Sequence, residues 1–260
     1  MAMLSEFDGD EPPLALVTGA GVRIGAALAR RLALRGFRVV LHCHRSRQAA
    51  DALAARLAAE GSPAPLVVSA DLAEADVAGR ILDPLPGPVR LLVNNASLFE
   101  EDQLADFTPA RWARHMDVNL RAPALLVQGM AARLPAPLTG LVVNLSDAKL
   151  ASPNPDFFSY TVSKMGLAGL TELAARALAP RIRVNAIAPA VTLVSGPQSR
   201  ANFAAAHVLN PLGRGVEAED IGRALDYLVD TPTVTGQTLV IDSGQRFLGL
   251  PRDVAYMVPA

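Results

Sequence analysis

Three residues of this sequence, Tyr160, Lys164 and Asp147, have the types and spacing to do chemistry together. Tyr160 and Lys164 are four positions apart, so a helix would bring both side chains to one face. Asp147 lies in the loop that follows an apolar strand at 141–145. A phenol has an ordinary pKa of about 10, and a neighbouring ammonium group lowers that pKa. The combination predicts proton transfer in carbonyl or imine chemistry.

A glycine-containing segment, TGAGVRIG at 18–25, separates an apolar strand at 14–18 from a helix that runs to about Arg35. Glycines allow the backbone to approach a ligand closely, and the helix N-terminus favours a pyrophosphate. The alternative is an ordinary tight turn between a strand and a helix. Because the strand and the helix are both readable, we predict a dinucleotide site.

The end of the next strand, at 37–42, predicts which dinucleotide binds. NAD sites place an acid about 20 residues after the glycines, but this chain has His44, Arg45 and Ser46 there. Arg45 and Ser46 could hold a 2′-phosphate through charge-assisted hydrogen bonds. The alternative is a solvated arginine before a helix at 47–60. We predict NADP(H).

Strands and helices alternate through the rest of the chain. Further strands are expected at 66–70, 89–93, 141–145, 182–187 and 238–241, and helices at 72–82, 109–133, 160–178 and 217–229. This order predicts an α/β fold of the Rossmann type: a doubly wound parallel sheet of about seven strands with helices on both faces. We expect a flexible N-terminus at 1–13, a single domain at 14–244 and a C-terminal tail at 245–260.

Several residues fall at the carboxyl ends of the strands, where such sheets bind ligands. Asp71 could meet an adenine, and the small Ala96 and Ser97 would leave room for a nicotinamide ribose. Phe99 is either core or a stacking platform for a flat substrate. Asn119 lies inside a helix, where asparagine is a mediocre former, so we expect a packing or functional reason. The irregular stretch at 193–215 is expected to be a substrate lid.

Composition excludes several classes of protein. The formal net charge is −1 and no basic run stands out, so nucleic acid and anionic membranes are not expected as partners. The apolar stretches are too short for a membrane span of about 20 residues. A single cysteine, Cys43, is consistent with the cytoplasm. The histidines lack metal-ligand spacing, so no metal is expected.

From Leu14 to Gly244 the sequence resembles the short-chain dehydrogenase/reductase family. The motifs that carry the likeness are TGAGVRIG at 18–25, DL at 71–72, NNA at 94–96, Asn119, YTVSK at 160–164 and the turn at Pro189. The resemblance implies an NAD(P)-dependent oxidoreductase in which Tyr160 is the acid/base, Lys164 lowers its pKa and binds the nicotinamide ribose, and Asn119 holds a water. The cofactor contacts that it implies are Gly19, Arg23, Ile24, Gly25, His44, Arg45, Ser46, Asp71, Leu72, Asn95, Ala96, Ser97, Tyr160, Lys164, Pro189, Val191 and Thr192.

Two positions depart from the family pattern. Arg23 stands where glycine is usual, and Asp147 stands where a carbonyl-polarising serine is usual. Both departures, with Phe99 after NNAS, are similar to the pteridine reductase branch. By that likeness Phe99 and the nicotinamide would sandwich a pterin, and Arg23 and Ser97 would contact cofactor phosphates and substrate. Asp147 would serve the ring nitrogens beside Tyr160; the alternative is drift at Asp147 in a protein that has lost activity.

The chemistry of the pair favours reduction. A carboxylate beside Tyr160 opposes Lys164 and raises the pKa of the phenol, which suits donation of a proton. A pterin also offers N–H donors that a carboxylate accepts. We therefore expect hydride transfer from NADPH to a C=N carbon and a proton to the adjacent nitrogen.

Three hypotheses stay open: a reductase of dihydropterins or a related flat heterocycle, a ketone reductase of the same family acting for example on a 3-oxoacyl thioester, and a non-catalytic NADP-binding sensor. Intact Tyr160 and Lys164 weigh against the sensor. The family resemblance further implies a homotetramer assembled through the helices that start near Pro109 and Phe157.

Overall fold

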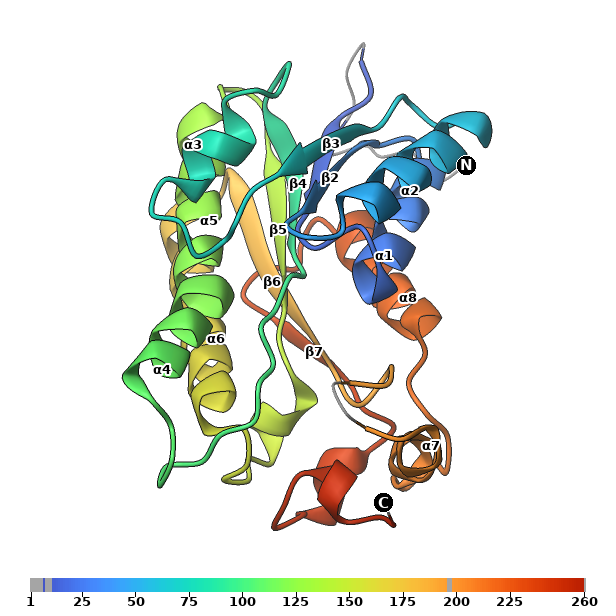
Figure 1. Cartoon of the computed structure of the whole chain (residues 1–260). Coiled ribbons are helices and arrows are strands. Elements are labelled where there is room, and N and C mark those ends of the chain that lie inside the picture. The colour runs from blue at the N-terminus through green and yellow to red at the C-terminus, as the bar shows by residue number, and fades with distance from the viewer. Residues whose placement is uncertain (1–6, 8–10, 196–197, 260) are drawn as a thin grey trace.

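The computed structural model describes residues 7, 11–195 and 198–259, and its centre is a seven-stranded sheet (Figure 1). The strand order is β3-β2-β1-β4-β5-β6-β7, and every neighbouring pair is parallel. The strands are β1 (Leu14–Val17), β2 (Arg38–Cys43), β3 (Leu66–Ser69), β4 (Val89–Asn94), β5 (Gly140–Leu145), β6 (Ile182–Pro189) and β7 (Thr238–Ile241). The predicted doubly wound α/β sheet is confirmed.

Helices cover both faces of the sheet. Figure 1 shows α1, α2 and α8 on one side, and α3, α4, α5 and α6 on the other. Their bounds are α1 (Arg23–Leu34), α2 (Arg47–Ala59), α3 (Val77–Leu82), α4 (Pro109–Met116), α5 (Ala122–Arg133), α6 (Phe158–Leu178), α7 (Arg200–Val208) and α8 (Ala218–Asp230).

The central strands are mostly apolar and buried because each face packs against a helix layer. In β1, Ala15 and Val17 join the hydrophobic cluster that contains α1 and α8. Leu14 and Leu16 point the other way, into the cluster that contains α3 and α5. This alternation is the two-residue period of a strand. It anchors β1 on both faces, and the glycine turn at 18–25 follows the carboxyl end of this strand.

Four segments differ from the expectations: the helix expected at 72–82 begins only at Val77, after a turn, and three others form structure that was not expected. The helix expected at 109–133 contains a π-helical turn at Asp117–Arg121, between α4 and α5. The lid region expected to be irregular contains α7. The tail expected to be irregular forms two 3₁₀ turns, Gln245–Leu248 and Val254–Tyr256. Each of these three segments has only a weak pattern in its own sequence. Contacts with distant residues order it, as described below for Asn119 and for the tail.

The expected flexible N-terminus falls mostly outside the described residues, which omit 1–6 and 8–10. Phe7 is described, and it is buried with its ring edge-on to Phe37 at 5.3 Å between centroids. Within the described ranges, no helix has both the length and the apolar character needed to cross a bilayer.

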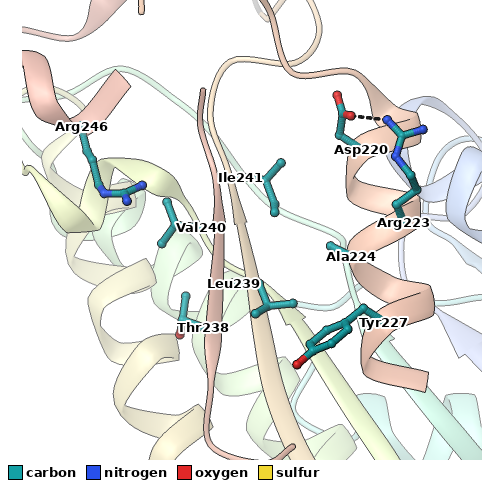
Figure 2. Close-up of a pocket in the computed structure, with 9 residues that line it drawn as sticks. All are labelled: Asp220, Arg223, Ala224, Tyr227, Thr238, Leu239, Val240, Ile241 and Arg246. Carbon is teal, nitrogen blue, oxygen red and sulfur yellow. Dashed lines mark hydrogen bonds and ion pairs between the residues drawn. The ribbon is translucent and has the colours of Figure 1, made fainter. Parts of the chain in front are cut away.

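A groove of about 630 Å³ runs along the outer edge of β7, beside α8 (Figure 2). Leu239 and Ile241 face Tyr227 and Ala224 across it, and the Asp220–Arg223 ion pair lies at one end. None of the predicted site residues lines this groove, so the candidate site lies elsewhere, at the carboxyl ends of the strands.

Candidate active site

Tyr160 and Asp147 meet at the carboxyl end of β5. Tyr160 lies in the first turn of α6 and is 6% exposed. Its hydroxyl donates to Asp147 Oδ2 at 2.5 Å. Asp147 Oδ1 accepts the backbone N–H of Lys149 at 2.8 Å, which fixes the carboxylate. The juxtaposition expected from the loop and the helix is therefore present.

Lys164 lies one helical turn after Tyr160 and is also buried. Its Nζ donates to the carbonyl oxygen of Leu145 at 2.7 Å and lies 5.7 Å from the centroid of the Tyr160 ring. Burial lowers the pKa of Lys164 to about 8, although the Asp147 carboxylate opposes this shift. The ammonium is thus held beside the phenol at the end of β5.

The environment keeps the proton on Tyr160. Burial raises the pKa of Tyr160 well above 10, and the charge and hydrogen bond of Asp147 raise it further. The direction agrees with the expectation that Asp147 would outweigh Lys164. A phenol that stays protonated near neutral pH can donate a proton, whereas a phenolate that would accept one is disfavoured.

Phe99 forms a wall beside this hydroxyl. Its ring stands edge-on to Tyr160, with 4.7 Å between centroids, and stacks on Phe157 at 4.2 Å. Phe99 is still 40% exposed, so part of the ring faces open space. Of the two readings left open for Phe99, this position fits a platform for a flat ligand better than a core side chain.

Asn119 holds the loop that carries Phe99. Its Oδ1 accepts the backbone N–H of Leu98 at 2.8 Å and the Ser97 hydroxyl at 3.3 Å. Its Nδ2 donates to the Leu98 carbonyl at 2.9 Å and to Ser163 Oγ at 3.0 Å. These bonds use both donors and both acceptor positions of the amide. The water-holding role implied for Asn119 stays a prediction. Because the side-chain amide is fully used, any such water would have to bond to the backbone carbonyl of Asn119.

Two further residues, which the sequence analysis missed, position the same loop. Asp102 is buried, and its Oδ1 accepts the Ser159 backbone N–H at 2.9 Å, so it caps α6 from a distant segment. His115 is fully buried, and its Nε2 accepts the Glu100 backbone N–H at 3.3 Å. Neither contact belongs to a local motif, because the Asp102 contact spans 57 positions and the His115 contact spans 15.

The glycine turn closes tightly at the carboxyl end of β1. A Cβ at Gly25 would lie 2.2 Å from the Gly19 carbonyl oxygen, so only glycine fits. Arg23 has a φ of 56°, in the region that favours glycine. This conformation explains why a glycine is the usual residue there, and it means that the arginine is retained at a cost in strain.

Asn95 fastens the turn to the end of β4. Its Nδ2 donates to the Thr18 carbonyl at 2.8 Å. The Thr18 hydroxyl in turn accepts the backbone N–H groups of Asn95 and Ala96, at 2.9 and 3.0 Å. These bonds set the distance between the glycine turn and the loop that carries Ser97 and Phe99.

His42 supports the turn from β2 and was also missed. Its Nδ1 accepts the Gly19 backbone N–H at 3.3 Å, and its Nε2 lies 3.1 Å from the Ala70 carbonyl. This pattern requires the neutral tautomer with the proton on Nε2. Burial lowers the pKa of His42 to about 4, which keeps it neutral. The ring therefore joins the glycine turn to the end of β3.

The residues predicted to select the cofactor lie beside the turn. Ser46 packs on Gly21, where an added Cβ would come within 2.6 Å of its hydroxyl. His44 Nε2 lies 3.8 Å from Asp71 Oδ2. Arg45 is exposed and forms no hydrogen bond or ion pair with the described residues. Leu72 is buried. A cation at the end of β2 is thus available for a phosphate.

One cleft of about 1370 Å³ runs from the glycine turn to Tyr160. Ligand pockets for a small molecule usually measure about 300–1,000 Å³, so this cleft has room for a dinucleotide and a second ligand. The predicted site residues that line it are Gly19, Arg23, Ile24, Gly25, Asn95, Ala96, Ser97, Phe99, Asp147, Tyr160, Lys164, Pro189, Val191 and Thr192. His44, Arg45, Ser46, Asp71, Leu72 and Asn119 are not among its lining residues.

Arg23 crosses the cleft to the start of the lid region. Its guanidinium donates to the Val194 carbonyl at 2.6 Å and to Ser195 Oγ at 3.4 Å. The predicted contacts of Arg23 with phosphate and substrate would require these bonds to be shared or exchanged. The fold, the glycine turn and the cation at the end of β2 together fit a dinucleotide cofactor.

Comparisons with known proteins agree with this geometry. FolM alternative dihydrofolate reductase 1 from Brucella suis, solved in complex with NADP, is similar over 91% of this chain and 95% of its own, with 43% identity and a TM-score of 0.86. The corresponding Brucella canis protein is 42% identical, with a TM-score of 0.84 over 90% and 94% of the two chains.

A relative with a different name is 3-oxoacyl-[acyl-carrier-protein] reductase of Synechocystis. It is 30% identical over 89% of this chain and 96% of its own length. The short chain dehydrogenase family matches residues 13–202 of this protein. The chain therefore belongs to the short-chain dehydrogenase family of oxidoreductases.

Proposed function

We propose that this protein is an NADPH-dependent reductase that transfers hydride to a C=N bond of a dihydropterin or a related flat heterocycle. The observation that carries the proposal is the 2.5 Å hydrogen bond from Tyr160 to Asp147, at the base of a cleft walled by Phe99. Phe99 and a bound nicotinamide would enclose a flat ring between them. The proximity of the FolM proteins in sequence and fold supports this proposal.

NADP(H) is the proposed cofactor. The glycine turn and the N-terminus of α1 would receive the pyrophosphate, and Arg45 would hold the 2′-phosphate. Lys164 would bind the nicotinamide ribose, and Asp71 would lie near the adenine. The nicotinamide supplies the hydride when the cofactor is bound. The complexes of the two Brucella FolM proteins with NADP are consistent with this choice.

Proton delivery is the task of Tyr160 and Asp147. As hydride reaches the carbon of the C=N bond, the adjacent nitrogen gains basicity and takes a proton. Tyr160 holds that proton, because its pKa lies well above 10. Asp147 accepts the hydroxyl hydrogen bond in the free enzyme and would accept N–H donors of a bound pterin ring. Bonds of this charge-assisted kind are about twice as strong as neutral ones.

The test is NADPH oxidation with dihydrobiopterin, dihydromonapterin and an acetoacetyl thioester, assayed side by side. We expect turnover with the dihydropterins. Turnover with the thioester alone would instead establish the ketone reductase, the second candidate, which the Synechocystis relative favours. In the Asp147→Ser variant, dihydropterin reduction should fall; undiminished reduction would remove the role given to Asp147.

Three further features belong to the proposed enzyme: a substrate lid, a subunit assembly and a cellular location. The lid expected at 193–215, of which residues 196–197 lie outside the described residues, would close over the substrate with α7. The assembly would be a homotetramer formed through α4 and α6. Leu173 of α6 supports it, because this apolar side chain is 68% exposed. Size-exclusion chromatography with light scattering would test the assembly. A cytoplasmic location is supported by Cys43, which is a free thiol.

A further inference from the structure

The C-terminal segment 250–258 forms part of the wall of the substrate end of the cleft. Figure 1 shows it, in red, beside α7 at the same end of the molecule as the lid region. The residues of this segment that line the cleft are Leu250, Asp253, Val254, Ala255, Tyr256 and Val258. They share the cleft with Phe99, Asp147 and Tyr160.

Asp156 anchors the segment. This carboxylate is 3% exposed and precedes α6 by two residues. Both of its oxygens accept Arg252 Nε, at 2.9 and 2.8 Å, and Oδ2 also accepts the Asp253 backbone N–H at 2.7 Å. Burial opposes ionisation of Asp156, but the hydrogen bonds from Arg252 and the Asp253 backbone, with the charges of Arg252 and Lys149, together outweigh it and lower the pKa. The carboxylate is therefore ionised at neutral pH and fully used by the segment.

A second anchor comes from α7. Asn202 is buried, and its Nδ2 donates to the Ala255 carbonyl at 2.8 Å and to the Pro259 carbonyl at 2.9 Å. The segment is thus tied both to the loop before α6 and to the helix of the lid region. Such ties at two points indicate a fixed wall rather than a loose chain end.

Tyr256 extends the aromatic wall from its outer side. Its ring is nearly parallel to that of Phe157, with 6.1 Å between centroids, and Phe157 stacks on Phe99. Phe157 has a φ of 53°, a conformation that is unfavourable for a bulky residue unless its surroundings hold it. The Tyr256 hydroxyl bonds Glu101, in the loop that carries Phe99. Arg252 covers the same tyrosine, with its guanidinium 4.9 Å from the ring centroid.

We propose that Tyr256 is a specificity-determining residue and that Arg252 is the positioning residue that holds it. Tyr256 backs the Phe157–Phe99 stack and limits the space at the outer end of the cleft, where the substituent of a flat heterocycle would emerge. This inference rests on the proposed function for the class of substrate. It assigns the choice among substituents to the C-terminal segment and leaves hydride transfer to the bound nicotinamide and proton transfer to Tyr160 and Asp147.

The test compares Tyr256→Ala, Tyr256→Phe, Arg252→Gln and Arg252→Lys with Arg176→Gln, a control at an exposed arginine of α6 whose partner is Glu172. Substrates are 6-methyl-dihydropterin, with a small substituent, and dihydromonapterin, with a larger one. In Tyr256→Ala, KM should rise about fivefold for both, the size of one lost aromatic pair. The ratio of kcat/KM between the two substrates should also shift by at least that factor towards the larger substituent, with kcat and the Kd for NADPH unchanged.

Tyr256→Phe keeps the ring and should keep the wild-type ratio. Arg252→Gln should shift the ratio in the same direction as Tyr256→Ala, Arg252→Lys should restore part of it, and Arg176→Gln should leave it unchanged. A wild-type KM and ratio in a folded Tyr256→Ala protein would overturn the inference. If the wild type reduces no dihydropterin, the proposed function fails instead. In that case the KM of the same variants for the acetoacetyl thioester tests whether Tyr256 limits the space in the cleft. An unchanged KM would reject this role, and a raised KM would support it.

Discussion

The two ends of the cleft are built in different ways. At the catalytic end, polar side chains bond to segments far away in the sequence: Tyr160 to Asp147, Asn119 to Leu98 and Ser163. At the cofactor end, His42 and Asn95 likewise fix the glycine turn, but Arg45, which lies outside the lining of the cleft, remains exposed. The first end is ordered by the protein itself, and so is the glycine turn, whereas Arg45 is a group that a ligand would order on binding.

This difference separates two tasks. Proton transfer needs the donor in position before the substrate reacts, and the hydrogen bond to Asp147 holds the Tyr160 hydroxyl in place without a ligand. Recognition of a phosphate needs a cation that can leave water and turn towards the charge, which an exposed arginine can do. Substitutions at the two ends should therefore fail in different assays.

The largest effect is expected for Tyr160→Phe. This variant lacks the hydroxyl proposed to donate the proton, so kcat for dihydropterin reduction should fall by about 10²–10⁴-fold. The Kd for NADPH, measured by quenching or calorimetry, should stay within about threefold of wild type, because the cofactor end does not depend on this hydroxyl. A comparable loss of NADPH binding would show that the two ends are not separate.

At the cofactor end, the buried neutral His42 should make the folded protein less stable in acid. Its pKa is about 4 in the folded chain against an ordinary 6.5. Between these two values the unfolded chain binds more protons, so the free energy of unfolding falls as pH decreases from 6.5 to 4. The full difference is about 3 kcal/mol.

Denaturant titrations at pH 7, 6 and 5 check this prediction, with His42→Gln as the comparison. The variant should lose less stability over that interval, because glutamine has no proton to gain. Equal pH dependence in the two proteins would mean that His42 is not held neutral against the glycine turn.

Arg45→Ala should weaken the binding of NADPH but not that of NADH. Loss of a charge-assisted hydrogen bond to a 2′-phosphate is worth roughly 1.5–3 kcal/mol, so KM for NADPH should rise about tenfold to a hundredfold. KM for NADH should not change, because NADH lacks this phosphate. The exposed Arg47, whose partner is Asp51, provides the matched control as Arg47→Ala. Equal preference for the two cofactors in both wild type and Arg45→Ala would exclude the role of Arg45.

The two ends also differ in how far the sequence reveals them. The glycine turn is encoded within eight residues, so its strand, turn and helix could be predicted together. Tyr160 and Lys164 could be paired because helix geometry fixes their spacing. The side chains that position the site could not. Asp102 reaches Ser159 across 57 positions and Arg252 reaches Asp156 across 96, and no local pattern records such contacts. The helix α7 was missed for a similar reason, since Asn202 joins it to the tail.

The smallest effect expected is a pH dependence at Lys164, which lies where the two ends meet. Its pKa is about 8 in the folded chain, against an ordinary 10.5, because burial disfavours the charge. Above pH 8 the folded protein loses the ammonium that would bind the ribose, so kcat/KM should decline, by about tenfold near pH 9. Tyr160 cannot cause this decline, because its pKa lies well above 10.

Stability should change in the opposite direction over the same interval. Between pH 8 and 10 the unfolded chain binds more protons at this lysine than the folded chain does, so the Lys164 contribution to the free energy of unfolding rises with pH. Lys164→Arg keeps a positive charge throughout and should abolish the decline in kcat/KM while lowering its maximum. A decline that persists with the same midpoint in a folded Lys164→Arg protein would assign it to another group and would separate Lys164 from both ends of the cleft.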